Sequence, residues 1–339
     1  MTAAREAERQ VFLSRVGWGA AARSHLAGDA SARSYERLAG SGRSAVLMDS
    51  PPGPADDTED FIRVARHLEG LGLSVPRILE AEPARGLLLL EDLGDALYTQ
   101  VLKADPLMER PLYDAAVDVL LALQSAPPPG EVPDLSAQDW AAATGLAPEF
   151  YAGAILGQSP DAVVFTECLA AAMERHADAA RVLILRDYHA GNLIWLPVRK
   201  GLARVGLLDF QQAQKGQPGY DLVSLLQDAR RDVAAETETA GIARFAAGAG
   251  LPVAEFAPAY ATLGAQRALR ILGIFARLCL IAAKPGYVAL IPRVWGQLMA
   301  NLAHPALSSL RRECLTLLPE PTPENLSRII ARCGLPLSP

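Results

Sequence analysis

The stretch that decides the fold is RDYHAGNLIWL, residues 186–196, together with LLDF at 207–210. In both segments a short apolar run, with the length and composition of a β-strand, borders a polar loop. Asp187 and Asn192 share the first loop, and Asp209 follows the second apolar run seventeen residues after Asn192. Functional side chains gather in loops at strand ends, so we expect these three residues to belong to one site.

The order D-x-x-x-x-N followed by D-F is typical of kinase active sites. A phosphoryl donor carries several negative charges, and the Mg²⁺ that bridges its oxygens prefers carboxylate and amide oxygen ligands. We therefore expect Asn192 and Asp209 to be metal ligands, and Asp187 to orient the acceptor hydroxyl and take its proton. The alternative is that these residues lie on the surface in two unrelated loops, because one motif alone is a weak signal.

The remaining sequence predicts an α+β chain in two parts, because single hydrophobic cores seldom grow to 339 residues. Up to about residue 95, short β-like runs alternate with loops around one amphipathic helix at 58–71. We expect a β-rich nucleotide-binding lobe at 1–95 and a helical lobe at 96–339 that holds the catalytic and acceptor-binding residues. The helices expected there are at about 110–125, 136–145, 160–180, 220–249, 254–283, 287–302, 305–317 and 323–333.

Composition limits the classes of partner. A formal net charge of −6 and a pI near 5.5 supply no basic field for nucleic acid. The most apolar stretch, 271–283, contains Arg277 and is shorter than the roughly 20 residues of a membrane span. The N-terminal segment does not resemble a signal peptide, and the four cysteines lack metal or disulfide spacing. We expect a cytoplasmic protein with a small-molecule partner, without nucleic acid, membrane or an obligate protein partner.

On these motifs the chain resembles the aminoglycoside phosphotransferase and choline kinase-like branch of the protein-kinase-like fold. That branch usually shows H-G-D-x-x-x-x-N, whereas Leu185 and Arg186 stand here in the places of His and Gly. The resemblance implies a two-lobed protein-kinase-like fold, with a small N-terminal β-rich lobe and a larger α-helical C-terminal lobe. It also implies ATP and Mg²⁺ as cofactors.

Further segments resemble the bacterial amino-sugar kinases of cell-wall recycling. They are GDASARSYERL (28–38), VLMDSPPG (46–53), LLLLEDLGD (87–95), LLDFQQAQKGQPGYDLVSLLQDARRD (207–232) and IPRVW (291–295). This resemblance implies ATP-dependent phosphorylation of the anomeric hydroxyl of N-acetylmuramate or N-acetylglucosamine in peptidoglycan recycling. The alternatives are a kinase of the same fold that acts on an aminoglycoside, choline or another sugar, and a nucleotide-binding pseudokinase.

The resemblance also assigns residues around the nucleotide. The loop with Asp29, Ser31 and Arg33 stands where kinases cover the phosphates, although an ordinary hairpin turn would look the same. Glu91 and Leu93 stand at the hinge, where backbone groups bind the adenine. Kinases usually place a lysine on the strand after the phosphate loop, but this chain has Met48 there. Either Arg33 or Arg43 must then supply the cation, or the phosphates depend more on Mg²⁺ and backbone N–H groups.

The acceptor side is less defined. No Asp or Glu occurs from Phe256 to Arg312, a region with seven Arg and Lys residues, which favours a neutral or anionic acceptor over a polycation. The resemblance implies that Asp221 braces the catalytic loop, and it is also placed to cap the helix that follows, so both roles are open. His189 either orients that loop or is only locally bonded. The residues expected to contact the sugar are Gln211, Gln212, Asp228 and Arg230.

Overall fold

The computed structural model describes residues 3–27, 33–53 and 58–335, which form two compact units. The first unit comprises Met1–Val119 and Ala190–Ala213, and the second comprises Leu120–His189 and Gln214–Pro339. Each unit is thus made of two separate chain segments. These two units do not correspond to a single division of the chain at residue 95. The predicted lobe boundary at residue 95 therefore stays a prediction.

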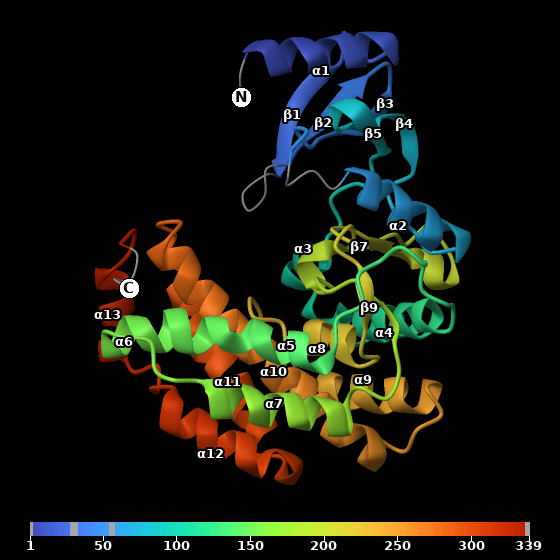
Figure 1. Ribbon diagram of the computed structural model, residues 1–339. Coiled ribbons are helices and arrows are strands. Elements are labelled where there is room, and N and C mark those ends of the chain that lie inside the picture. The colour runs from blue at the N-terminus through green and yellow to red at the C-terminus, as the bar shows by residue number, and fades with distance from the viewer. Residues whose placement is uncertain (1–2, 28–32, 54–57, 336–339) are drawn as a thin grey trace. The chain divides into compact units, whose positions relative to one another are not determined.

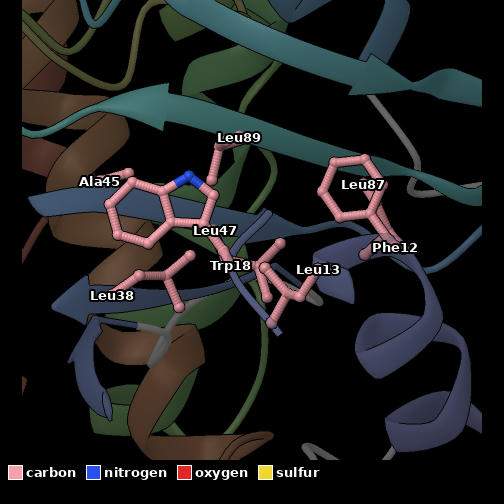
Figure 2. Close-up of a cluster of buried hydrophobic side chains, with 8 residues drawn as sticks. All are labelled: Phe12, Leu13, Trp18, Leu38, Ala45, Leu47, Leu87 and Leu89. Carbon is pink, nitrogen blue, oxygen red and sulfur yellow. The ribbon is translucent and has the colours of Figure 1, made fainter. Parts of the chain in front are cut away.

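The first unit is built on a five-stranded antiparallel sheet with the strand order β1-β2-β3-β5-β4 (Figure 1). Helix α1, which the sequence did not predict, packs on one face of this sheet through Phe12 and Leu13 (Figure 2). Trp18 and the sheet residues Leu38, Ala45, Leu47, Leu87 and Leu89 complete this apolar cluster. The bounds are α1 Ala3–Arg15, β1 Ala22–Ala27, β2 Ser34–Gly40, β3 Arg43–Asp49, β4 Ile78–Glu82 and β5 Leu87–Glu91.

Strand register decides which face Met48 occupies. Leu47 pairs with Leu89 on the face covered by α1, and because successive side chains alternate between faces, Met48 lies on the other face. Met48 pairs with Tyr35 and Leu88 and is fully buried. A buried thioether therefore occupies the position at which the resemblance to kinases leads one to expect a lysine.

The rest of the first unit includes two strands, β7 and β8, which form an antiparallel pair. The helix expected at 58–71 is confirmed as α2, whose buried Phe61, Val64, Ala65 and Leu68 follow helical spacing. The elements here are α2 Thr58–Gly70, α3 Tyr98–Ala104, β7 Leu193–Trp195 and β8 Val205–Leu207, and α4 Glu109–Gln124 continues across the division into the second unit.

The second unit is mainly helical. Its longest helix, α10, runs for 28 residues and contacts α7, α8, α9, α11 and α13. Its elements are α5 Ala137–Ala142, α6 Gly153–Leu156, α7 Val163–His176, β6 Val182–Ile184, β9 Gln214–Gly216, α8 Tyr220–Leu226, α9 Ala235–Gly248, α10 Val253–Leu280, α11 Ile291–Leu302, α12 Ser308–Leu317 and α13 Pro323–Ala331. Short helices of other types occur at Pro83–Arg85, Pro106–Met108, Ala143–Gly145, Ala147–Ala152, Ala190–Asn192, Gly201–Arg204, Pro285–Leu290 and Pro305–Leu307.

The single helix expected at 220–249 is wrong, because the structure divides it into α8 and α9. The Asp228 carboxylate accepts the backbone N–H of Arg230 at 2.8 Å, a local bond that competes with helical hydrogen bonding. Among the described residues, no helix is long and apolar enough to cross a membrane.

Candidate active site

Asp209 lies just beyond the end of β8, next to the start of β7. The Leu208 N–H donates to the Asn192 carbonyl at 3.0 Å, which holds the two residues at one end of the β7/β8 pair. Asn192 Nδ2 lies 3.5 Å from Asp209 Oδ2. Asp209 has a φ of 56°, in the left-handed region that non-glycine residues seldom adopt, and such strain is typical of functional sites. The structure thus brings the two predicted metal ligands together.

Two further side chains hold the Asp209 carboxylate. Arg33 Nη2 lies 3.2 Å from Oδ1, and Gln211 Nε2 donates to the same oxygen at 2.8 Å. The Arg33 side chain is only 8% exposed, whereas that of Asp209 is 42% exposed. The next residue, Phe210, packs on Phe61 of α2 with 4.8 Å between ring centroids. The Asp209 carboxylate is therefore held by Arg33 and Gln211 and is still partly exposed to solvent.

The donor set fits a magnesium ion that shares its ligands with a phosphate. No group of three or more His, Cys, Asp or Glu side chains among the described residues could hold a metal by itself. Mg²⁺ in phosphoryl-transfer sites is bound by one or two protein oxygens together with substrate phosphates and water. Asn192 and Asp209 provide such a pair, one amide and one open carboxylate.

Of the two arginines considered for the missing lysine, only Arg33 lies at Asp209. The Arg43 guanidinium instead stacks on the Trp18 ring, 4.7 Å from its centroid. Asp29 and Ser31 lie outside the described residues. At the expected hinge, the Glu91 N–H donates to the Arg77 carbonyl at 2.8 Å. Adenine contacts by the backbone groups of Glu91 and Leu93 stay a prediction.

A carboxylate of the second unit organises the loop that carries Asp187. The two Asp221 oxygens accept the backbone N–H groups of Leu185 and Arg186 at 2.6 and 2.9 Å. Arg186 is left-handed with a φ of 72°, and the Asp187 N–H donates to the Leu185 carbonyl at 2.9 Å, so a tight turn presents Asp187. The bracing of this loop by Asp221 is confirmed. The expected helix cap is wrong, since the N-cap residue of α8 is Gly219 and Asp221 lies within the first turn.

Burial changes the acidity of two groups near this turn. Complete burial raises the pKa of Asp221 to about 7, against the opposing effect of its two backbone hydrogen bonds. Burial also lowers the pKa of His189, whose charged neighbours are Asp228, Arg230, Arg267 and Asp187. His189 is thus a buried imidazole among charged side chains, and its burial favours the neutral form.

The four residues expected to contact the sugar separate into two pairs. Asp228 and Arg230 lie in the second unit beside His189, and Asp228 is buried. Gln211 and Gln212 lie in the first unit, where Gln211 binds Asp209 and Gln212 is exposed. Sugar contacts by these residues stay a prediction.

Sequence reasoning missed two supporting residues, Ser224 and Arg267. Arg267 Nη2 donates to Ser224 Oγ at 2.8 Å, and that hydroxyl donates to the Arg186 carbonyl at 3.3 Å. A signal was present, because each is a polar residue inside an otherwise apolar helical run.

The chain belongs to the phosphotransferase enzyme family, whose sequence pattern it matches over residues 23–266. It is thus a phosphotransferase, and it is similar to proteins named N-acetylmuramate/N-acetylglucosamine kinase. The one from Caulobacter vibrioides is 40% identical and the alignment covers 92% of this chain and 96% of the relative. The one from Pseudomonas aeruginosa is 34% identical, with coverage of 90% and 91%.

Solved structures confirm the fold. The choline kinase LicA of Streptococcus pneumoniae superposes with a TM-score of 0.59 at 14% identity, over 86% of this chain and 98% of that one. The chain therefore has the expected α+β, protein-kinase-like fold, with a smaller β-rich N-terminal part and a larger helical C-terminal part.

Proposed function

We propose that this protein is an ATP- and Mg²⁺-dependent kinase that phosphorylates the anomeric hydroxyl of N-acetylmuramate or N-acetylglucosamine. Its place would be cytoplasmic peptidoglycan recycling. The relative from Caulobacter vibrioides, which carries the name of such a kinase and aligns over almost the whole of both chains, supports this acceptor. The observation that carries the proposal in the structure is the Asn192–Asp209 pair at the end of the β7/β8 strands.

The proposed roles follow from chemistry. Asn192 and Asp209 hold the metal, which when bound neutralises charge on the donor phosphates. Asp187 orients the acceptor hydroxyl and takes its proton, and Asp221 fixes the turn that presents it. These residues bind and position, which is the main contribution of a protein to phosphoryl transfer.

The nucleotide is assigned to the first unit. Arg33 is proposed to contact its phosphates together with Asp29 and Ser31, and backbone groups of Glu91 and Leu93 to contact the adenine. Arg33 already lies at the metal carboxylate, which supports its selection over Arg43.

The test is turnover by Asp187→Asn and Asp209→Asn, with Glu324→Gln as the matched control. Glu324 carries a carboxylate that is 75% exposed and paired with Arg328 in α13. Loss of a positioned general base or of a metal ligand should lower kcat by about 100-fold or more, whereas the control should retain wild-type kcat. Phosphorus NMR of the wild-type product should show a sugar 1-phosphate.

One observation favours a non-catalytic alternative, namely the buried Met48 in place of the strand lysine. Background turnover that is equal in the wild type and both variants would support a pseudokinase. Turnover of choline or an aminoglycoside in preference to the sugars would keep the kinase and change its acceptor.

A further inference from the structure

The segment 227–232, which connects α8 to α9, is held by one face of α11. Arg293 and Gln297 lie four residues apart on α11, so their side chains share that face. The Gln297 amide donates to the Asp228 carbonyl at 3.1 Å. The Arg293 guanidinium bonds both carboxylate oxygens of Asp232, at 2.6 and 2.9 Å. Two successive turns of α11 therefore hold the middle and the end of the segment.

The start of the segment is held by a buried pair of amides on the next turn of α11. Asn301 Nδ2 donates to Gln227 Oε1 at 2.8 Å, and Gln227 Nε2 lies 3.2 Å from Asn301 Oδ1. Gln227 Nε2 also lies 3.1 Å from Glu238 Oε1 on α9. Both amide side chains are buried. Buried polar groups that satisfy one another favour a single arrangement, so α11 and α9 define the path of the segment.

The segment carries a carboxylate with an unused hydrogen-bonding oxygen. Asp228 is only 2% exposed. Its Oδ1 accepts the Arg230 N–H at 2.8 Å, whereas its Oδ2 makes no hydrogen bond to any residue that the structure describes. A carboxylate oxygen that has lost most of its water favours a hydrogen-bond donor. A bound ligand with a suitable group would supply that donor.

Helix α8 connects Asp228 to the turn that presents Asp187. Ser224 on α8 donates to the Arg186 carbonyl of this turn at 3.3 Å. Asp228 follows Ser224 by four residues, which at the rise of a helix corresponds to roughly 6 Å. All of these residues belong to the second unit. A ligand of the size of a monosaccharide is therefore long enough to contact both Asp187 and Asp228.

We propose that Asp228 binds the acceptor sugar through Oδ2, and that Arg293, Gln297 and Asn301 of α11 are its positioning residues. This inference rests on the proposed function and adds to it a contact for the acceptor and the element that supports this contact. The donor would be a hydroxyl or acetamido N–H group, which N-acetylmuramate and N-acetylglucosamine share. Asp228 would therefore bind both sugars without distinguishing between them.

Asp228→Asn tests the contact, because it removes the charge and keeps the shape of the side chain. The KM for both sugars should rise by about 10- to 100-fold, the usual effect of a lost hydrogen bond to a charged group. The KM for ATP should stay within about twofold, which also shows that the variant is folded. The kcat at saturating sugar should change by less than about twofold, because Asp221 still holds the turn of Asp187.

Gln297→Met tests the positioning role, because it keeps the length of the side chain and removes the amide that holds the Asp228 carbonyl. The KM for both sugars should rise by about two- to tenfold, the effect of one neutral hydrogen bond. In the double variant the two effects should not add, because Gln297 acts through Asp228. Additive effects would overturn the positioning role. The matched control is Gln138→Met on α5, whose amide donates to Glu174 at the surface, and it should leave every constant unchanged.

Calorimetry of sugar binding without ATP separates this inference from the proposed function. Weaker binding of both sugars by Asp228→Asn supports the inference, even if the wild type transfers no phosphoryl group to C1, an outcome that would remove only the proposed function. Wild-type affinity of Asp228→Asn for both sugars would overturn the inference, and normal transfer to C1 would then leave the proposed function standing. A rise in the KM for ATP alone would also overturn the inference.

Discussion

At the scale of single residues, Arg33 is the residue of the first unit whose contact bears most directly on the proposed metal site. Its guanidinium is buried and lies 3.2 Å from the carboxylate proposed to bind the metal. A cation at this place offsets the charge of Asp209 and would compete with the proposed metal for the same oxygen. Donor phosphates would give the guanidinium an alternative partner. Arg33 would thereby couple metal binding at Asp209 to nucleotide binding.

We therefore predict opposite effects of Arg33→Ala on two ligands. The KM for ATP should rise by about tenfold or more, since a charged hydrogen bond to phosphate is lost, while binding of adenosine should stay unchanged. Binding of free Mn²⁺, followed by its electron paramagnetic resonance, should become tighter because a competing cation has gone. Arg43→Ala is the matched control, because Arg43 stacks on Trp18. Weaker binding of both Mn²⁺ and ATP would indicate a structural role and contradict the coupling.

The sequence predicted the residue types of this site better than their partners. Asp187, Asn192 and Asp209 could be found because a loop motif fixes their spacing, and two of them lie together at the end of one strand pair. The bonds of Asp209 to Arg33 and Gln211 could not be found in this way. They depend on side-chain directions and on a contact between residues 176 positions apart, which no local pattern encodes.

At the scale of elements, helix α8 supports the turn before Asp187 through one buried carboxylate. Asp221 satisfies two backbone N–H groups that would otherwise be buried without acceptors. Asp221→Ala should destabilise the protein by roughly 1–3 kcal/mol for each group left unsatisfied. Urea unfolding at constant pH measures this, and Glu324→Gln on the surface of α13 should show almost no change. If Asp221→Ala lowered the free energy of unfolding as little as the control does, water would have to replace the carboxylate as the acceptor of these N–H groups.

The raised pKa of Asp221 predicts a pH dependence with a definite sign. Because the folded-state pKa, about 7, lies above the ordinary value of 3.8, the folded protein binds the extra proton in this range. The stabilisation of the folded protein by this proton on Asp221 is complete below about pH 4, and it is lost as the pH rises to about 7. The unfolding free energy of the wild type relative to Asp221→Asn should therefore fall by up to about 1.4 kcal/mol per pH unit in that window. A difference that stays constant from pH 4 to 7 would contradict the raised pKa.

Element boundaries show where pattern reading fails. The helix at 58–71 was predictable because its apolar residues recur at helical spacing and a glycine ends it. The segment 220–249 has similar apolar content, yet the Asp228 bond to the Arg230 N–H lies between α8 and α9. A hydrogen bond between a carboxylate and a backbone N–H two residues further on leaves no trace in the periodicity of apolar residues. The α1 helix was not predicted because polar residues dominate it and only three of its residues are buried, namely Arg9, Phe12 and Leu13.

At the scale of the whole molecule, the class of fold was predictable, because β-rich and helix-rich segments separate along the sequence. The division into compact units was not. Residues 190–213 join the N-terminal segment although they lie in the middle of the chain. The reason is visible in their partners, since the Leu207 N–H donates to the Ser74 carbonyl and the Trp195 N–H to the Ala96 carbonyl, each at 2.8 Å. Such long-range backbone pairing leaves no local pattern.

The cysteines provide a test of the packing of the second unit, which contains all four of them. Burial raises the pKa of the Cys314 thiol to about 12, and burial with the neighbouring Cys333 does the same for Cys279. Cys168 and Cys333 are half-buried. Because the thiolate is the reactive form, Cys279 and Cys314 should react with a disulfide reagent at pH 8 about 100-fold or more slowly than an accessible thiol.

Labelling of the native protein should then be biphasic, with a fast phase from Cys168 and Cys333 and a slow phase from the two buried thiols. In guanidinium chloride all four should react in one fast phase, because unfolding removes the burial that raises the pKa. The double variant Cys168→Ser, Cys333→Ser is the matched control and should lose the fast phase while keeping the slow one. A single fast phase for four thiols in the native protein would mean that α10 and α12, which carry Cys279 and Cys314, open readily to solvent, contrary to the burial of both thiols.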